Sequence, residues 1–217
     1  MKKQDIKRGN PELILAVLAK TYPDAGPELN FSNPFETLIA TMLSAQSTDV
    51  QVNKATPALF RDYPTAEKMA QSTPEVIFPY VQSCGFKSKA TNIVLAARDI
   101  VNRFDGRVPD TMEDLTSLKG VGRKTANVVL ANAFGIPAMA VDTHVLRVSN
   151  RLGLADAKTP EMTEQQLMAQ IPKALWIKAH HWLIHHGRRV CKAQRPKCGE
   201  CALLTLCAHP QVKQNEE

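Results

Sequence analysis

Apolar residues recur at the spacing of an α-helix along this sequence, and this periodicity predicts the fold class. Between Phe35 and Leu43 they stand at positions i, i+3, i+4, i+7 and i+8, on one face of a helix. Asn33, Pro34 and Glu36 supply an N-cap, a first-turn proline and an acidic third residue, so we predict that a helix starts here. No run of alternating β-branched residues lies between hairpin turns, and the sequence therefore predicts no sheet.

Further helices follow from the same two signals. A second one-sided stripe runs from Ile93 to Phe104 and ends at Asp105-Gly106, a pair that commonly terminates helices. The prolines after Asn10 and Thr73 mark two more helix starts. We therefore expect an all-α fold with helices of about 8–15 residues joined by short turns. No apolar run approaches the roughly 18 residues of a membrane span, and we expect no membrane partner.

Positive charge is concentrated in two segments. The chain has 27 Lys and Arg against 21 Asp and Glu, a formal net charge of +6. Residues 115–151 contain five basic residues and one acid, and residues 177–207 contain six basic residues and one acid. Such a surface is typical of proteins that bind DNA or RNA, although a solvated basic face leaves the same pattern. The basic N-terminus lacks the apolar core of a secretion signal, and we expect a cytoplasmic protein.

Four of the five cysteines lie within 17 residues in the pattern C-x6-C-x2-C-x5-C, at Cys191, Cys198, Cys201 and Cys207. Thiolates gathered this closely indicate a metal centre, since intracellular disulfides are uncommon and a redox pair is the weaker alternative. Zinc sites usually have two close pairs of ligands, and only Cys198 and Cys201 form such a pair. The spacing favours an iron–sulfur cluster only slightly, so zinc stays open. Cys84 stands apart and is expected in the core.

The segment 115–130 predicts two helices joined by a tight turn. Gly120-Val121-Gly122 separates two short apolar-periodic stretches. Glycines let the backbone approach a ligand closely, and the unpaired N–H groups that start the second helix favour an anion such as a phosphate. Arg123 and Lys124 follow in the first turn, where the helix dipole disfavours cations unless an anion is bound. The pattern therefore predicts a contact with a nucleic-acid backbone that ignores base sequence.

Six motifs together resemble the endonuclease III family of iron–sulfur DNA glycosylases and abasic-site lyases, within the helix-hairpin-helix superfamily. They are Leu29-Asn-Phe31, Leu43-Ser-Ala-Gln-Ser-Thr-Asp49, the hairpin 120–129, Val141-Asp-Thr-His144, His180-His-Trp-Leu183 with His186-Gly187, and the four-cysteine segment. The resemblance covers nearly the whole length. It implies a bifunctional repair enzyme that excises oxidised pyrimidines from double-stranded DNA and cleaves the abasic strand by β-elimination. We expect a bacterial, nucleoid-associated monomer.

The resemblance also implies two helical domains. One comprises residues 27–136, six helices that end in a helix-hairpin-helix motif at about 112–131, and the other combines 1–26 with 137–217. The second domain would hold a 4Fe–4S cluster on the four cysteines. Three cations in six residues lie between its first two cysteines, and we expect them to contact the DNA backbone: Lys192, Arg195 and Lys197.

Two residues are expected to carry the reaction, because the family places a nucleophilic lysine at Lys124 and an aspartate at Asp142. An amine that attacks C1′ of the deoxyribose displaces the base, and the resulting imine acidifies the C2′ proton, so that the strand breaks. A carboxylate stabilises positive charge on the sugar and assists proton transfer. The residues alone allow two other roles: a phosphate contact for Lys124 and a helix N-cap for Asp142.

Several further residues are expected to contact DNA. Extruding the damaged nucleotide leaves a hole, and the family fills it with a polar residue at Gln46. A second wedge is expected near Phe86, in a loop one residue shorter than the family pattern, which weakens its role. Lys119 stands where the family has proline. Two interpretations are open: its N–H or its charge adds a phosphate contact, or the lysine is simply tolerated there. The predicted contacts of the hairpin are therefore Lys119, Gly120, Val121, Gly122 and Arg123.

The histidines near position 180 raise a competing hypothesis. His181 and His185 stand at i and i+4, the spacing of a metal site, but apolar residues interrupt the set and no acid lies nearby. Packing and phosphate contact explain them more simply. Two other functions are also open: a monofunctional adenine glycosylase, which would lack the lysine at 124, and a DNA-binding or electron-carrying protein, which would need neither Lys124 nor Asp142.

Overall fold

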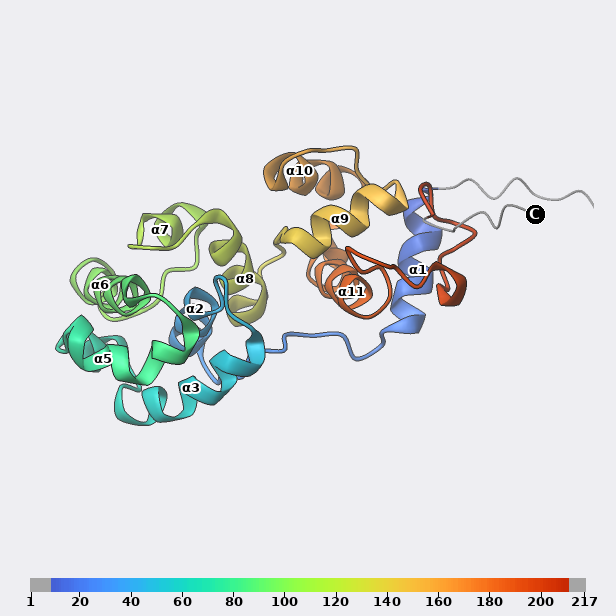
Figure 1. The fold of residues 1–217 in the computed structure, drawn as a ribbon. Coiled ribbons are helices and arrows are strands. Elements are labelled where there is room, and N and C mark those ends of the chain that lie inside the picture. The colour runs from blue at the N-terminus through green and yellow to red at the C-terminus, as the bar shows by residue number, and fades with distance from the viewer. Residues whose placement is uncertain (1–8, 211–217) are drawn as a thin grey trace, which may run out of the picture. The chain divides into compact units, whose positions relative to one another are not determined.

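The computed structural model describes residues 9–210, and every regular element in this part of the chain is helical. The first eight α-helices and one short 3-10 helix are α1 (Pro11–Thr21), α2 (Pro34–Leu43), α3 (Asp49–Asp62), α4 (Ala66–Ala70), α5 (Pro74–Val81), η1 (Gln82–Cys84), α6 (Lys87–Phe104), α7 (Met112–Ser117) and α8 (Arg123–Phe134). The later elements are α9 (Thr143–Leu152), α10 (Pro160–Gln170), η2 (Lys173–Leu175), α11 (Trp176–Arg189) and η3 (Cys198–Glu200). The all-α prediction is confirmed (Figure 1). No described helix is long and apolar enough to cross a membrane.

The helices form two compact units (Figure 1). The middle unit consists of residues 27–138, and the terminal unit combines residues 1–26 with 139–217. The chain passes between them at Gly26–Pro27 and at Ala138–Met139. The sequence predicted domain boundaries between residues 26 and 27 and between residues 136 and 137, and the second boundary lies two residues later in the structure. The assignment of these units to a hairpin domain and a cluster domain stays a prediction.

The middle unit is built around α2, which packs against α3, α6 and α8. The predicted start of α2 is confirmed, because the N–H of Glu36 donates to Oδ1 of Asn33 over 2.9 Å, with Pro34 in the first turn. The largest fully buried side chains of the unit come from six of its helices: Leu38, Ile39, Leu43, Leu59, Met69, Ile77, Ile93, Ile100 and Leu115. The predicted apolar stripe of α2 therefore faces the core.

Helix lengths differ from the prediction in both directions. Helix α6 has 18 residues, while α4 has 5 and α7 has 6. Helix α6 extends back from the predicted stripe to Lys87, since no glycine or proline lies between Gly85 and Ile93 and Ala90 is fully buried. Its end agrees with the prediction: Asp105 adopts the left-handed conformation at φ +51°, and the helix stops there.

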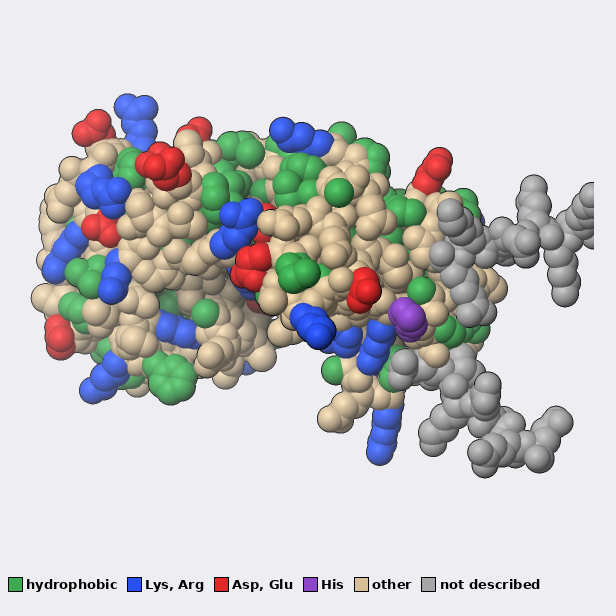
Figure 2. All heavy atoms as spheres, turned by 90° about the horizontal axis from the view of Figure 1, so that it is seen from above, with side chains coloured by type: hydrophobic (Ala, Val, Ile, Leu, Met, Phe, Trp, Pro, Cys, Tyr) green, Lys and Arg blue, Asp and Glu red, His purple; other side chains and the backbone are tan. Residues whose placement is uncertain are grey.

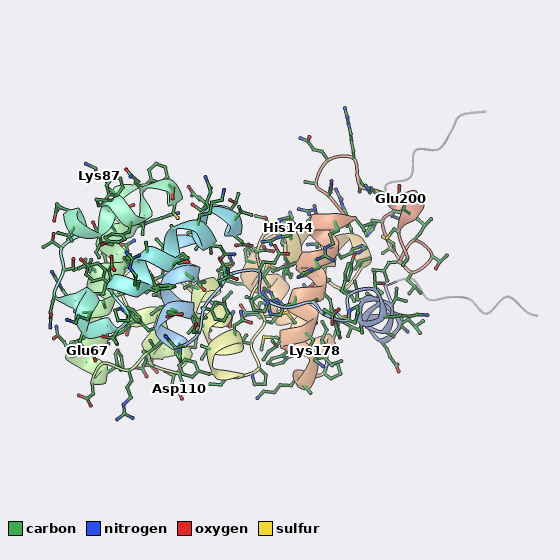
Figure 3. The ribbon with its side chains drawn as sticks, turned by 90° about the horizontal axis from the view of Figure 1, so that it is seen from below. Glu67, Lys87, Asp110, His144, Lys178 and Glu200 are labelled. Atoms are coloured by element: carbon green, nitrogen blue, oxygen red, sulfur yellow. The ribbon has the colours of Figure 1, made fainter. Side chains whose placement is uncertain are left out.

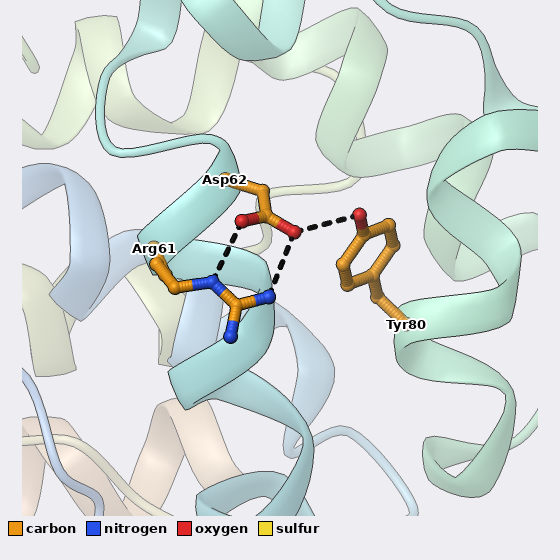
Figure 4. A network of polar contacts seen from close by, with 3 residues as sticks. All are labelled: Arg61, Asp62 and Tyr80. Atoms are coloured by element: carbon orange, nitrogen blue, oxygen red, sulfur yellow. Dashed lines mark hydrogen bonds and ion pairs between the residues drawn. The ribbon is translucent and has the colours of Figure 1, made fainter.

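A polar network on the surface joins the end of α3 to α5 (Figure 4). Arg61 donates from Nε to Oδ1 of Asp62 over 2.8 Å and from Nη2 to Oδ2 over 3.1 Å. The hydroxyl of Tyr80 donates to the same Oδ2 over 2.9 Å. These hydrogen bonds, that of Arg61 above all, lower the pKa of the Asp62 carboxyl. The network fixes the α3–α5 contact at a solvent-exposed edge.

The terminal unit has its core where α1, α9 and α11 meet. Helices α9 and α11 approach closely at Gly187, where a Cβ would lie 3.0 Å from Cβ of His144 and from Cγ2 of Val148. Ile14, Leu18 and Leu183 are fully buried in this core. The close approach sets the position of α9, the helix that begins directly after Asp142.

The histidines of α11 pack inside this core with partners of their own. His180 Nδ1 lies 2.7 Å from the carbonyl oxygen of Ala140, and His185 Nε2 lies 3.2 Å from that of Gly26. His186 Nδ1 and the hydroxyl of Tyr22 form a hydrogen bond of 3.0 Å. Packing within the unit therefore accounts for these side chains.

The buried histidines make the terminal unit sensitive to acid. Burial, with smaller contributions from His180 and His185, lowers the pKa of His181 from 6.5 to about 3. As the pH falls from 6.5 towards 3, His181 therefore takes up a proton in the unfolded chain but stays neutral in the folded state. We expect the free energy of unfolding to drop by up to about 1.4 kcal/mol per pH unit across this window for this one group.

Urea unfolding at a series of pH values checks this expectation. The variant His181→Gln should have a shallower loss of stability between pH 6.5 and 4 than the wild type, because the titrating ring is gone. His209→Gln removes a histidine that is exposed to solvent and should follow the wild-type curve. If the stability of His181→Gln and of the wild type fell equally with pH, His181 would not be a source of the acid sensitivity.

Candidate functional site

The predicted hairpin lies between α7 and α8 and is anchored in the core of the middle unit. The side chains of Leu118 and Val121 are buried, and the N–H of Val121 donates to the carbonyl oxygen of Leu118 over 3.1 Å. Gly120 adopts φ +78°, and a Cβ there would lie 2.8 Å from the side chain of Asn92. Only glycine fits this turn without displacing its neighbours.

The N-terminus of helix α8 has the features of an anion-binding site. Its N-cap is Gly122, and no side chain caps the first turn. The space that a Cβ would take on Gly122 is open, with no atom within 4 Å. Arg123 and Lys124, the first two residues of the helix, are exposed. This end of α8 therefore combines N–H groups, the positive end of a helix dipole and a primary amine on one surface.

Two of the residues predicted to contact DNA have hydrogen-bond partners within the protein. The backbone N–H of Lys119 donates to Oδ2 of Asp99 over 3.1 Å, so in the structure without DNA this N–H already has a partner, while the charged side chain is exposed. The contact of Lys119 with a phosphate stays a prediction. Val121 is buried and its N–H is bound to Leu118, as described above. Gly120, Gly122 and Arg123 stay candidates for direct contact.

Asp142 is the N-cap of α9 in the terminal unit. Its Oδ1 accepts a hydrogen bond from the N–H of Val145 over 2.8 Å, and its side chain is half-buried. The capping role that the sequence allowed is therefore real. Capping occupies one carboxylate oxygen, and a carboxylate has two, so capping and chemistry are compatible. Lys124 belongs to the middle unit and Asp142 to the terminal unit.

A hollow of about 260 Å³ in the middle unit brings together three of the predicted DNA contacts. Gln46, Phe86 and Gly120 line it, with Lys89 and Asn92 between them. Gln46 is exposed at φ +57°, in the turn between α2 and α3. Phe86 is 70% exposed, an uncommon state for a large apolar ring, and is the N-cap of α6. Two exposed side chains beside the hairpin are suited to entering a base stack.

The four cysteines Cys191, Cys198, Cys201 and Cys207 line one pocket of the terminal unit. Burial raises the pKa of the Cys201 and Cys207 thiols, and the neighbouring cysteines raise it further. Cys207 Sγ lies 3.0 Å from the carbonyl oxygen of Arg151, and Nη1 of Arg151 lies 3.6 Å from Sγ of Cys191. Segments that are distant in sequence thus converge on one sulfur-rich pocket.

The loop between the first two cysteines presents its charges to solvent. Lys192, Arg195 and Lys197 are all exposed, and Lys and Arg side chains gather on and beside the projecting loop of the terminal unit in Figure 2. Lys197 lies 3.6 Å from the carboxylate of Glu200, which Figure 3 labels. An exposed pair of this kind is weak, so the loop keeps most of its positive field.

Comparisons with known proteins bear on this arrangement. Residues 39–173 match the family described as HhH-GPD superfamily base excision DNA repair protein. The chain belongs to this superfamily. It is 49% identical to endonuclease III of Synechocystis over 98% of both chains, and 45% identical to endonuclease III of Escherichia coli K12 over 91% of this chain and 94% of that one.

Solved structures agree with the sequence relatives. A trapped endonuclease III–DNA covalent intermediate matches with a TM-score of 0.87 and 44% identity, covering 92% of this chain and 95% of that one. A thermostable thymine-DNA glycosylase matches with a TM-score of 0.82 at 22% identity, which supports the fold alone. The predicted resemblance is confirmed: the chain is a base excision repair enzyme that acts on DNA, a glycosylase with abasic-site lyase activity.

Residues that the sequence does not single out support each part of the site. Arg147 of α9 donates from Nε to the carbonyl oxygen of Cys191 over 3.1 Å, and Arg151 donates to that of Lys192 over 2.7 Å. Lys89 contacts three acceptors around the Gln46 turn. The one available signal for Lys89 is its place in the first turn of a helix, where a cation is unfavourable without a partner.

Proposed function

We propose that this chain excises oxidised pyrimidines through an imine on Lys124 and then cleaves the strand. The observation that carries the proposal is the exposed amine of Lys124 in the first turn of α8. This helix starts directly after its N-cap Gly122, and no side chain caps its first N–H groups. A phosphate bound to the N–H groups of this turn would hold the DNA backbone beside the amine. The similar endonuclease III that is trapped as a covalent intermediate with DNA supports a covalent step.

The proposed reaction has two stages on one deoxyribose. The neutral Lys124 amine attacks C1′, the bond from C1′ to the base breaks, and the base leaves with the bonding electron pair and takes up a proton. The sugar ring then opens to give an imine between Nζ and C1′. Loss of the acidified C2′ proton expels the 3′ phosphate, which leaves an unsaturated imine that water hydrolyses to free the lysine.

Asp142 is proposed to assist both stages through its charge. Its carboxylate would stabilise positive charge that develops on the sugar and accept a proton from the attacking amine. The N–H of Val145 holds one of its oxygens, which fixes the orientation of the group at the start of α9. A held carboxylate loses little freedom when the substrate binds.

Gln46 and Phe86 are proposed to occupy the space that the extruded nucleotide leaves. Both side chains are exposed and line the same hollow as the hairpin glycine. Gln46 has an amide donor and an acceptor, so it can face any orphaned base. Unstacking costs a few kcal/mol, which such a contact would partly offset.

The four cysteines are proposed to hold a 4Fe–4S cluster. All of them line one pocket, and Arg147 and Arg151 bind the backbone carbonyl oxygens of Cys191 and Lys192, which holds the segment that carries the first thiol. Each cysteine of a 4Fe–4S cluster binds a different iron, and the sequence spacing, with Cys198 and Cys201 as its one close pair, favours a cluster over zinc slightly. The proposed role is to shape the basic loop.

Iron analysis tests the cofactor. The purified chain should contain about four iron atoms and four sulfides, and Cys198→Ser should lose most of the iron. Cys84→Ala changes a buried cysteine that does not line the pocket and should keep the iron of the wild type. Zinc in place of iron would contradict the proposal.

Salt dependence tests the basic loop. Changing Arg195 and Lys197 to alanine should flatten the slope of log K against log salt by roughly 1–2 units, for one or two phosphate contacts at about 0.9 each. The double change of Lys54 and Lys68 to alanine removes the same charge from exposed positions of the middle unit and should keep the wild-type slope. Equal slopes for all three proteins would mean that the loop does not touch phosphates.

A duplex with one oxidised pyrimidine separates this function from its alternatives. The proposed enzyme releases the base and leaves a strand break that ends in an unsaturated aldehyde. A monofunctional glycosylase would leave the strand intact, and a binding protein would release nothing. Because the curated relatives are bacterial and the chain acts on DNA, we also propose a cytoplasmic location. We propose in addition that the protein acts as a monomer.

A further inference from the structure

Lys89 is the third residue of α6, and its amine contacts the two segments that carry Gln46 and Phe86. It donates to the carbonyl oxygen of Leu43 over 2.9 Å and to Oγ of Ser47 over 3.0 Å. It also donates to the carbonyl oxygen of Cys84. An ammonium group has three N–H donors, so these three acceptors use all of them.

The acceptors explain why a cation is stable at this position. The dipole of α6 disfavours positive charge in its own first turn. Leu43 is the last residue of α2 and Cys84 is the last residue of η1, so both carbonyl groups lie at helix ends that lack intrahelical donors. Lys89 satisfies both ends at once. Partial burial of the amine lowers its pKa, and the carbonyl groups offset part of that cost.

One side of this contact holds the turn with Gln46. The N–H of Ser47 donates to the carbonyl oxygen of Ser44 over 3.1 Å, and its hydroxyl donates to the carbonyl oxygen of Cys84. Gln46 lies between these serines at φ +57°, a conformation that non-glycine residues adopt only when their surroundings impose it. The hydrogen bonds of Ser47 with Lys89 and Cys84 hold the backbone of Gln46 in this conformation.

The other side holds the turn with Phe86. Cys84 and Gly85 precede the exposed ring, and Gly85 adopts φ +115° with the Nζ of Lys89 at 3.8 Å from where a Cβ would stand. No side chain caps the start of α6 at Phe86. The amine, together with the hydroxyl of Ser47, therefore ties this turn to the Gln46 turn, and both turns open onto the same hollow.

We propose that Lys89 is a positioning residue that fixes the Gln46 and Phe86 turns relative to each other, so that both side chains can fill the gap left by an extruded nucleotide. The inference rests on the proposed function. All three N–H groups of Lys89 point to protein acceptors, so it acts through the two turns and not on the DNA. Its effect should be largest where a paired, stacked base must be displaced.

Single-turnover rates of Lys89→Met on two substrates test the proposal. On a duplex with a paired oxidised pyrimidine, base release should slow by about 10-fold, because methionine keeps most of the length of the lysine side chain and loses all three donors. Strand cleavage at a preformed abasic site, where no base pair is broken, should stay within about 2-fold of the wild type. Lys54→Met removes an exposed lysine of the same unit and should leave both rates unchanged.

A double-mutant cycle separates positioning from general loss of structure. If Lys89 acts through the Gln46 turn, adding Lys89→Met to Gln46→Ala should slow base release by less than about 3-fold further. Ser47→Ala keeps the lysine and cuts the link to Cys84, and a loss of about 3-fold on the paired lesion alone is expected. This variant decides the matter if Lys89→Met does not fold.

The outcomes also distinguish this proposal from the one on which it rests. Equal losses on both substrates, full additivity with Gln46→Ala, or a wild-type rate for Lys89→Met on the paired lesion would each overturn the role of Lys89. A wild-type protein that neither releases the base nor cleaves the strand would overturn the proposed function instead, whatever the variants do.

Discussion

Replacing Lys124 with glutamine is expected to abolish base release and strand cleavage together. Glutamine keeps a polar side chain of similar reach in the first turn of α8 but has no nucleophilic amine, so the covalent step cannot begin. A loss of about 10³-fold or more in single-turnover rate on an oxidised-pyrimidine duplex is expected. Binding to abasic DNA should persist, because Gly122 and the N–H groups of the helix start are unchanged.

Lys119→Gln is the matched control for this variant. It removes an exposed lysine of the same hairpin whose N–H is held by Asp99 and whose side chain is expected to contact a phosphate. Binding should weaken, while cleavage at saturating enzyme should proceed. If Lys124→Gln cleaved abasic DNA as fast as the wild type, the phosphate-contact role of Lys124 would stand and another amine would be the nucleophile.

Replacing Asp142 with asparagine should slow the reaction while preserving the fold. Asparagine is as good an N-cap as aspartate, so its side-chain oxygen can accept the same bond from the N–H of Val145 and the stability should stay within about 0.5 kcal/mol. The lost negative charge should lower the single-turnover rate by about 10²-fold. Denaturant unfolding and rate measurements on the same preparation check both parts.

Asp142→Ala completes this comparison. It removes the cap as well as the charge and should cost about 1 kcal/mol of stability in addition to the loss of rate. An Asp142→Asn enzyme that turns over at the wild-type rate would leave capping as the whole role of this residue.

Local signals in the sequence predicted much of the fold. The N-cap and apolar stripe from Asn33 to Leu43 became α2, and Asp105 ended α6 where the pattern placed it. Helix α6 was longer than its stripe because propensity, rather than apolar spacing, decides where an exposed helical turn begins. Short helices such as α4 carry too few turns for periodicity to reveal their length.

The supporting contacts of the site could not be predicted from sequence. The bond that the N–H of Lys119 donates to Asp99 and the bond that Lys89 donates to Leu43 each join residues at least 20 positions apart. No local pattern encodes such pairs, because they form only when helices that start far apart pack together. The motifs predicted which residues belong to the hairpin, whereas the tertiary contacts determine which of their N–H groups are free for DNA.

The same limit applies to the cysteine segment. Its spacing predicted four thiolates in one place, and all four line one pocket. The two arginines that bind the carbonyl oxygens of Cys191 and Lys192 come from α9, more than 40 positions earlier for each contact. Their position on the helix that Asp142 caps links the proposed cluster to the proposed catalytic carboxylate through one rigid element.

Borohydride trapping tests the central claim most directly. The wild-type protein is incubated with a duplex that contains one oxidised pyrimidine, sodium borohydride reduces any imine to a stable amine, and the crosslinked peptide is mapped. We predict a covalent complex in which the DNA is attached to Nζ of Lys124, and no such complex with Lys124→Gln. A crosslink at another amine, or strand cleavage by the wild type with no trapped complex, would contradict the lysine-imine mechanism.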